Sequence, residues 1–178
     1  MLNVARLNTA VCALLAMLLA GASSAAAQAT RGSTGLPLPR FVSLKAEQVN
    51  LRVGPSTDYA VSWRYQKSGL PVEIIQEYEN WRRIRDADGT EGWVNQSLLT
   101  GERTAVAAPW MRGNGDSVYV MMRRDSMSSA QIIAKLEPGV IMRLEECNGN
   151  WCRAQVQGVT GWVSQAEIWG AYPGEAFK

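Results

Sequence analysis

The chain has 178 residues, with 18 lysine and arginine side chains against 16 aspartate and glutamate side chains, and no histidine. This near balance of charge excludes the basic field that a nucleic-acid surface or an anionic membrane requires. The lack of histidine removes the commonest metal ligand and general base, and no nucleotide, zinc or serine-hydrolase motif occurs. We therefore expect no nucleic-acid partner, no metal, no cofactor and no enzymatic activity.

Residues 1–27 are typical of a secretory signal peptide. Arg6 is the only charged side chain, an apolar run covers residues 11–20, and three alanines at 25–27 suit cleavage. Cleavage after Ala29 is a second option. Because the apolar run is shorter than the ~20 residues needed to span a bilayer, we expect a periplasmic or secreted protein with no membrane anchor after cleavage.

The rest of the chain has the pattern of short strands separated by turns. Residues 28–40 contain two glycines and two prolines and are interpreted as a linker. Beyond them, alternating apolar residues such as Val72 and Ile74 are bounded by turn clusters, without a long helical period. The predicted segments are a first domain at 41–102, a connector at 103–114, a second domain at 115–172 and a tail at 173–178.

One sequence pattern occurs twice in this all-β chain, with equivalent glycine, tryptophan and apolar positions in the same order. The first copy has Gly69, Val72, Ile74, Trp81, Ile84 and Gly92-Trp93-Val94, and the second has Gly139, Met142, Leu144, Trp151, Ala154 and Gly161-Trp162-Val163. Agreement at this many positions indicates two copies of one domain of roughly 60 residues. A unit this small, without a recurring catalytic residue, favours a binding module.

The glycine–tryptophan–valine triplets are predicted to be structural. Gly92 and Gly161 are expected where a side chain would block the close approach of strands. Trp93 and Trp162, each held between a glycine and a valine, are expected in the core of their domains.

These motifs resemble a known family. Val49-Asn50-Leu51-Arg52-Val53-Gly54-Pro55-Ser56, followed by Gly69, Trp81-x-x-Ile84 and Gly92-Trp93-Val94, looks like the bacterial Src-homology-3-like domain over residues 45–100. The second copy resembles a divergent member over residues 116–170, of a type found in exported proteins of Gram-negative bacteria. The resemblance implies two SH3-like, partly open barrels of five to six strands in tandem. Many relatives bind a cell-wall peptide or a partner protein. The resemblance therefore also implies binding to a cell-wall peptide or to an envelope protein partner.

Aromatic residues of the first copy are the candidate ligand-binding residues. Tyr59, Trp63 and Tyr65 lie close together in the sequence, and strand parity turns Trp81 outward. The matching segment of the second copy, 125–134, has no aromatic residue. Because amphipathic aromatics suit a groove for an extended peptide, we expect the first barrel to bind the ligand. The alternative is an envelope scaffold in which these aromatics form the seam between two packed barrels.

Cys147 and Cys152 are the only cysteines that remain after cleavage of the signal peptide, and export predicts a disulfide between them. Metal binding is the competing interpretation, but two thiolates without histidine form an incomplete site. A register that pairs Leu144 with Ala154 offsets the two thiols by one residue. The disulfide therefore requires a β-bulge in this hairpin.

Overall fold

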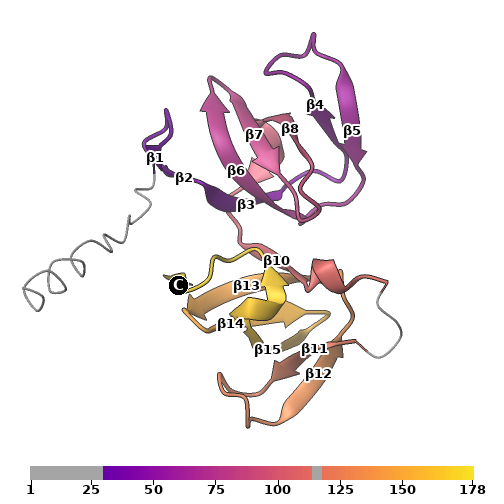
Figure 1. Ribbon diagram of the computed structural model, residues 1–178, viewed down its shortest axis with the longest axis vertical. Coiled ribbons are helices and arrows are strands. Elements are labelled where there is room, and N and C mark those ends of the chain that lie inside the picture. The colour runs from indigo at the N-terminus through magenta and orange to yellow at the C-terminus, as the bar shows by residue number, and fades with distance from the viewer. Residues whose placement is uncertain (1–29, 114–117) are drawn as a thin grey trace, which may run out of the picture.

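The computed structural model describes residues 30–113 and 118–178 (Figure 1). The predicted signal peptide at 1–27 lies outside these residues. Within them the chain is almost entirely β-structure and forms two barrels, one after the other along the chain. No helix in these two ranges is long and apolar enough to cross a membrane. The prediction of two all-β domains in tandem is confirmed.

The first barrel is one antiparallel sheet with the spatial order β5-β4-β8-β7-β6-β3-β9. Its strands are β3 (Arg40–Leu44), β4 (Val49–Arg52), β5 (Val61–Tyr65), β6 (Pro71–Tyr78), β7 (Trp81–Arg85), β8 (Glu91–Asn95) and β9 (Leu99–Thr100), with a 3-10 helix at Gln96–Leu98. Alternate residues of each strand face inward. The core contains valine, leucine and isoleucine side chains: Leu44, Val49, Leu51, Val72, Ile74, Ile84 and Val94.

The second barrel repeats this order as β12-β11-β15-β14-β13-β10-β16. Its strands are β10 (Thr104–Ala107), β11 (Val120–Arg123), β12 (Ile132–Leu136), β13 (Ile141–Asn148), β14 (Trp151–Val156), β15 (Val159–Ser164) and β16 (Ile168–Trp169), and its 3-10 helices are Pro109–Met111 and Gln165–Glu167. An additional strand, β17 (Ala176–Phe177), pairs with β13. Each barrel thus has more strands than the five or six expected.

Three segments predicted as linker, connector or tail carry structure. In the linker, β1 (Thr30–Arg31) pairs with β2 (Pro37–Leu38), and Leu38 packs on the first core. In the connector, β10 is buried at all four positions and belongs to the second sheet. The tail carries β17. These segments are too short for a strand pattern to stand out, and β10 and β17 pair with a strand that is distant in the sequence.

The prediction that Trp93 and Trp162 lie in the core is wrong. Both are half-buried, whereas Val94 and Val163 beside them are fully buried. Successive residues of a strand point to opposite faces. The triplet can therefore direct inward either its tryptophan or its glycine and valine, and in both barrels the glycine and valine face inward.

Crowding around Gly92 and Gly161 explains why the glycine and valine of each triplet face the interior. A Cβ on Gly92 would lie 2.5 Å from Leu51 Cγ, and a Cβ on Gly161 would lie 2.7 Å from the carbonyl oxygen of Arg123. Real Cβ atoms are not found so close to other heavy atoms. The predicted close approach of strands at Gly92 and Gly161 is therefore confirmed, and it requires the glycine to face the crowded interior.

The two barrels meet along a seam formed by Phe41, Glu73, Trp169 and Tyr172. Phe41 belongs to neither core, yet it is only 6% exposed, because its ring stands edge-on to Trp169 at 5.1 Å and lies 4.7 Å from the ring of Tyr172. The Tyr172 hydroxyl donates to Glu73 Oε1 at 2.8 Å, and Arg85 Nε donates to Glu73 Oε2 at 2.9 Å. Burial and the bond to Glu73 raise the pKa of Tyr172 above its usual range, so the hydroxyl keeps its proton.

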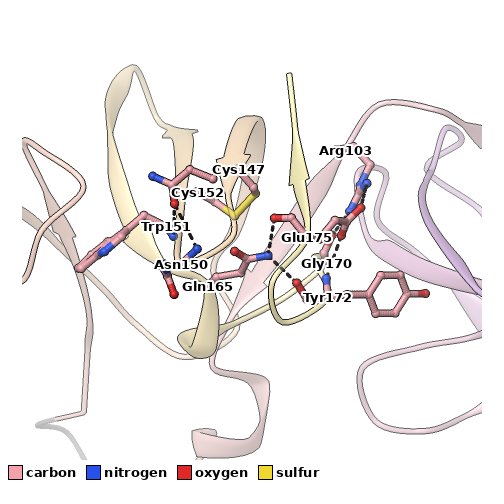
Figure 2. Close-up of a disulfide and its surroundings, with 10 residues drawn as sticks. Arg103, Cys147, Asn150, Trp151, Cys152, Gln165, Gly170, Tyr172 and Glu175 are labelled. Carbon is pink, nitrogen blue, oxygen red and sulfur yellow. Dashed lines mark hydrogen bonds and ion pairs between the residues drawn. A yellow bond between two sulfur atoms is a disulfide. The ribbon is translucent and has the colours of Figure 1, made fainter. Parts of the chain in front are cut away.

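Arg103 holds the C-terminal segment against this seam. Its guanidinium donates to both carboxylate oxygens of Glu175, at 2.8 and 3.0 Å, and to the carbonyl of Gly170 at 2.8 Å. The same guanidinium lies 4.4 Å from the centre of the Phe177 ring. Burial alone would raise the pKa of Glu175, but the guanidinium of Arg103 and the backbone N–H of Tyr172 outweigh it and the pKa is lowered (Figure 2). The chain end consequently lies where the two barrels meet (Figure 1).

We predict that Gly92→Ala lowers the free energy of unfolding by about 1–3 kcal/mol, because the new methyl group overpacks the first core. Gly101→Ala is the matched control, since a Cβ there meets nothing within 4 Å. Urea unfolding of both variants tests this. Equal stability of Gly92→Ala and the wild type would contradict the close approach described above.

Candidate functional site

A cavity of about 410 Å³ lies between the first barrel and β10 of the second. We call it the inter-barrel cavity. An indole, a phenol and aliphatic side chains share its wall with two carboxylates and one guanidinium. The lining residues are Trp63, Tyr65, Leu70, Pro71, Val72, Asp86, Ala87, Asp88 and Thr90 of the first barrel, with Val106 and Arg112 from the second.

Trp63 stands at this cavity on a free sheet edge. It lies on β5, the last strand in the order of the first sheet, which pairs only with β4 among the described residues. Trp63 is opposite Leu51, and a register shift after Leu51 bends the end of the β4–β5 hairpin. While Leu51 is fully buried, Trp63 is 57% exposed. An exposed aromatic beside an unpaired strand edge suits the addition of an extended peptide.

Tyr65 is a buried residue that contacts the cavity rather than an exposed binding aromatic. Its side chain belongs to the first core, and its hydroxyl donates to Asp86 Oδ2 at 2.9 Å. Burial, reinforced by Asp86, raises the pKa of Tyr65 above its usual range, so the phenol stays neutral. Asp86 Oδ1 accepts the backbone N–H groups of Asp88 and Thr90. The loop that closes one side of the cavity is thereby fixed.

Asp88 and Arg112 bring opposite charges to the cavity from the two barrels. Their side chains form an exposed ion pair at 3.3 Å. The sequence places Arg112 only in a connector. The Asp-x-Asp-Gly turn signals a tight loop, but no local pattern indicates that Arg112 approaches it from the other barrel.

The other two predicted aromatics lie elsewhere. Tyr59 is 48% exposed on the β4–β5 hairpin, with its ring so close to Gly54 that a Cβ there would be 2.5 Å from Tyr59 Cγ. Trp81 is half-buried at the turn between β6 and β7, opposite Tyr78. Of the four candidates, the structure brings only Trp63 and Tyr65 together at one cavity.

An arginine positions the hairpin that carries Trp63. Arg52 Nη1 donates to the carbonyls of Thr57 and Tyr59, at 2.8 and 2.6 Å. In the second barrel the matched Arg123 donates to the carbonyl of Ala130 at 2.9 Å. An arginine with five donors can satisfy loop carbonyls in this way. Both arginines are therefore structural.

The disulfide Cys147–Cys152 is present, with the two Cα atoms 4.1 Å apart. Leu144 pairs with Ala154, and a register shift immediately after Leu144 places Cys147 directly opposite Cys152. The predicted disulfide and the bulge that it requires are both confirmed. No cluster of cysteine and carboxylate side chains able to hold a metal occurs in the part of the chain that the structure describes.

The first barrel has an ion pair at the position of this disulfide. Glu77 and Arg82 are directly opposite after an equivalent register shift, and their charged groups lie 3.6 Å apart. Glu77 also accepts hydrogen bonds from the backbone of Thr34 at 2.9 Å and from Arg40 at 2.6 Å. Burial alone would raise the pKa of Glu77, but these donors outweigh it and lower the pKa to about 2.

A sequence model of the bacterial SH3 domain matches residues 45–101 and again residues 116–170. The two matches cover more than half of the chain and coincide with the two barrels. The chain belongs to the bacterial SH3 domain family. Bacterial SH3 domains are generally binding modules. Among curated proteins none matches this tandem pair.

Two solved structures are similar to this bacterial SH3 pair at low identity. NlpC2 from Trichomonas vaginalis is 10% identical, with a TM-score of 0.33, over 74% of this chain and 48% of that one. NlpC1 from Trichomonas vaginalis is 10% identical, with a TM-score of 0.32, over 78% of this chain and 48% of that one. The chain therefore spans about half the length of these two proteins.

We predict that reducing the disulfide destabilises the second barrel by about 2 kcal/mol, the loop-closure value for so short a loop. Urea unfolding with and without dithiothreitol measures the difference, and a Cys147→Ala/Cys152→Ala variant should not respond to the reductant. Alkylation of the oxidised protein followed by mass spectrometry should detect no free thiol. Two modified cysteines would refute the assignment.

The lowered pKa of Glu77 predicts that the first barrel loses stability in acid. Its folded-state pKa of about 2 is below the ordinary value of 4.5, so its stabilising contribution is complete above pH 4.5 and is lost as the pH falls toward 2. Glu77→Gln should reduce the slope of unfolding free energy against pH in this window. An unchanged slope in urea unfolding at several pH values would show that Glu77 is not the group responsible.

Proposed function

We propose that this bacterial SH3 pair is a non-catalytic binding protein that takes an extended peptide along β5 of the first barrel. The observation that carries the proposal is Trp63, an aromatic that is mostly exposed on an unpaired strand edge and also lines the inter-barrel cavity. The peptide backbone would pair with the free edge of β5. One of its side chains would then enter the cavity beside Trp63.

The cavity supports a peptide with both apolar and polar character. Leu70, Pro71 and Val72 provide an apolar wall, whereas Asp88 and Arg112 provide one group of each charge. Because these two charges already pair with each other, we expect moderate salt to weaken binding only slightly. A peptide of the cell wall or a segment of an envelope protein partner is the class of ligand that we propose.

The proposed place of action is outside the cytoplasm, in the periplasm or secreted. The disulfide is compatible with an oxidising compartment, and residues 1–27 have the pattern of a signal peptide.

A second candidate function is an envelope scaffold in which the packed barrels serve assembly without a small ligand. The buried seam around Phe41 favours it, because it fixes the two barrels against each other. However, Tyr59, Trp63 and Trp81 are not part of the seam. The exposure of Tyr59 and Trp63, at 48% and 57%, supports the binding function over the scaffold.

The test compares Trp63→Ala with Trp110→Ala for retention on purified cell wall. Trp110 is a matched control, since it is 53% exposed but does not line the inter-barrel cavity. An aromatic anchor contributes ~2 kcal/mol, so Trp63→Ala should weaken retention roughly thirtyfold. Trp110→Ala should bind like the wild type.

Both variants are first shown to unfold like the wild type in urea. If the wild type is retained and folded Trp63→Ala is retained equally, the proposed peptide site is wrong. If the wild type is not retained at all, the cell-wall ligand is wrong.

A further inference from the structure

The two opposite charges in the inter-barrel cavity are accessible to a ligand. Both Asp88 and Arg112 line the cavity, and their side chains are 64% and 44% exposed. Arg112 Nη1 lies 3.4 and 3.3 Å from the two carboxylate oxygens of Asp88, whereas a strong charge-assisted hydrogen bond is about 2.8 Å long. Because an exposed ion pair of this kind contributes little to stability, a ligand can separate the two groups at low cost.

The loop that carries Asp88 is fixed by its neighbour Asp86. The carboxylate of Asp86 accepts hydrogen bonds from the Tyr65 hydroxyl and from the backbone N–H groups of Asp88 and Thr90. These bonds hold the backbone at Asp88 in place and leave its carboxylate exposed on the cavity wall. Asp86 also adds a second negative charge to that wall, which favours a cationic group of the ligand on this side.

The side chain of Arg112 is positioned by a glycine of the second barrel. Gly139 lies in the turn before β13, and a Cβ on it would be 3.1 Å from Arg112 Nε and 3.5 Å from Arg112 Cδ. The N–H of Gly139 donates to the carbonyl of Ala107 at 2.7 Å, which ties this turn to β10 on the side of the second barrel that faces the first (Figure 1). At the matched Gly69 of the first barrel, a Cβ would meet nothing within 4 Å. The close fit at Gly139 therefore holds Arg112 beside the cavity.

The second barrel has neither the aromatic residue nor the carboxylates at the matched positions. Ala134 takes the place of Trp63 in the β11–β12 hairpin. The turn at 156–160, which matches the turn at 86–91, contains no aspartate or glutamate. A barrel of this family thus forms without these groups. Small-molecule sites typically combine an aromatic wall with a few placed polar groups, and the inter-barrel cavity has this combination.

We propose that the peptide side chain that enters the inter-barrel cavity ends in an α-amino-acid group, an inference that rests on the proposed function. Its ammonium contacts Asp88, its carboxylate accepts from the guanidinium of Arg112, and its aliphatic stem lies on the indole of Trp63. Because the two protein groups are 3.3 Å apart, the two ligand charges must also be close together, as they are on a single carbon. A side chain with one charge would leave Asp88 or Arg112 without a counter-charge.

The test is calorimetric titration of the protein with two soluble tripeptides that differ by one carboxylate. The side chain of L-alanyl-γ-D-glutamyl-meso-diaminopimelate ends in an α-amino-acid group, whereas that of L-alanyl-γ-D-glutamyl-L-lysine ends in an ammonium alone. The diaminopimelate peptide should bind about tenfold more tightly or better. Equal affinities would overturn the inference and leave the peptide site intact. If neither peptide binds while retention on cell wall still depends on Trp63, the inference is wrong and the proposed function stands.

Three variants, each first shown to unfold like the wild type in urea, assign the two charges. Arg112→Gln should weaken the diaminopimelate peptide about tenfold and remove its advantage over the lysine peptide. Arg124→Gln is the matched control, because Arg124 is an exposed arginine of the second barrel that does not line the cavity. Asp88→Asn should weaken both peptides, since both carry the ammonium. A folded Arg112→Gln variant that keeps the full preference for the diaminopimelate peptide would overturn the proposal.

Discussion

Glu73 is a carboxylate buried between the two barrels, and the arrangement of the chain depends on how that charge is balanced. A buried carboxylate without partners costs several kcal/mol. Arg85 of the same barrel supplies the opposite charge, and Tyr172 of the second domain supplies a hydrogen bond. Since Tyr172 can reach Glu73 only when the barrels are packed together, this contact also keeps β10 and Arg112 beside the first barrel. The inter-barrel cavity is a consequence of that packing.

Local periodicity and the repeat were sufficient to predict the fold. Strand alternation, turn residues and the spacing of the two copies indicated two all-β domains, and the offset of the two cysteines even indicated a bulge in β13. The same alternation did not decide which face of the Gly-Trp-Val triplet is inside. A large apolar residue suggested the core, but the crowding around Gly92 and Gly161 requires the glycine there.

The site was less predictable, because its parts come from segments distant in the sequence. Trp63 and Tyr65 were both predicted to bind the ligand, but Tyr65 is a core residue whose hydroxyl is bonded to Asp86. The guanidinium of Arg112 meets Asp88 only because β10 joins the second sheet. Four small residues at 104–107 give no strand signal of their own. The cavity could therefore not be predicted from the sequence.

Because the chain is synthesised from its N-terminus, the seam stays incomplete until the second barrel has been made. Phe41 is synthesised long before Tyr172 and Trp169, the residues that cover it. Until these follow, the first domain presents an uncovered aromatic ring on its outer face, and Glu73 has its ion pair with Arg85 but lacks the hydrogen bond from Tyr172. Such transiently exposed surface is where aggregation begins and where chaperones bind. The first barrel is thus a vulnerable intermediate for as long as the second is unfinished.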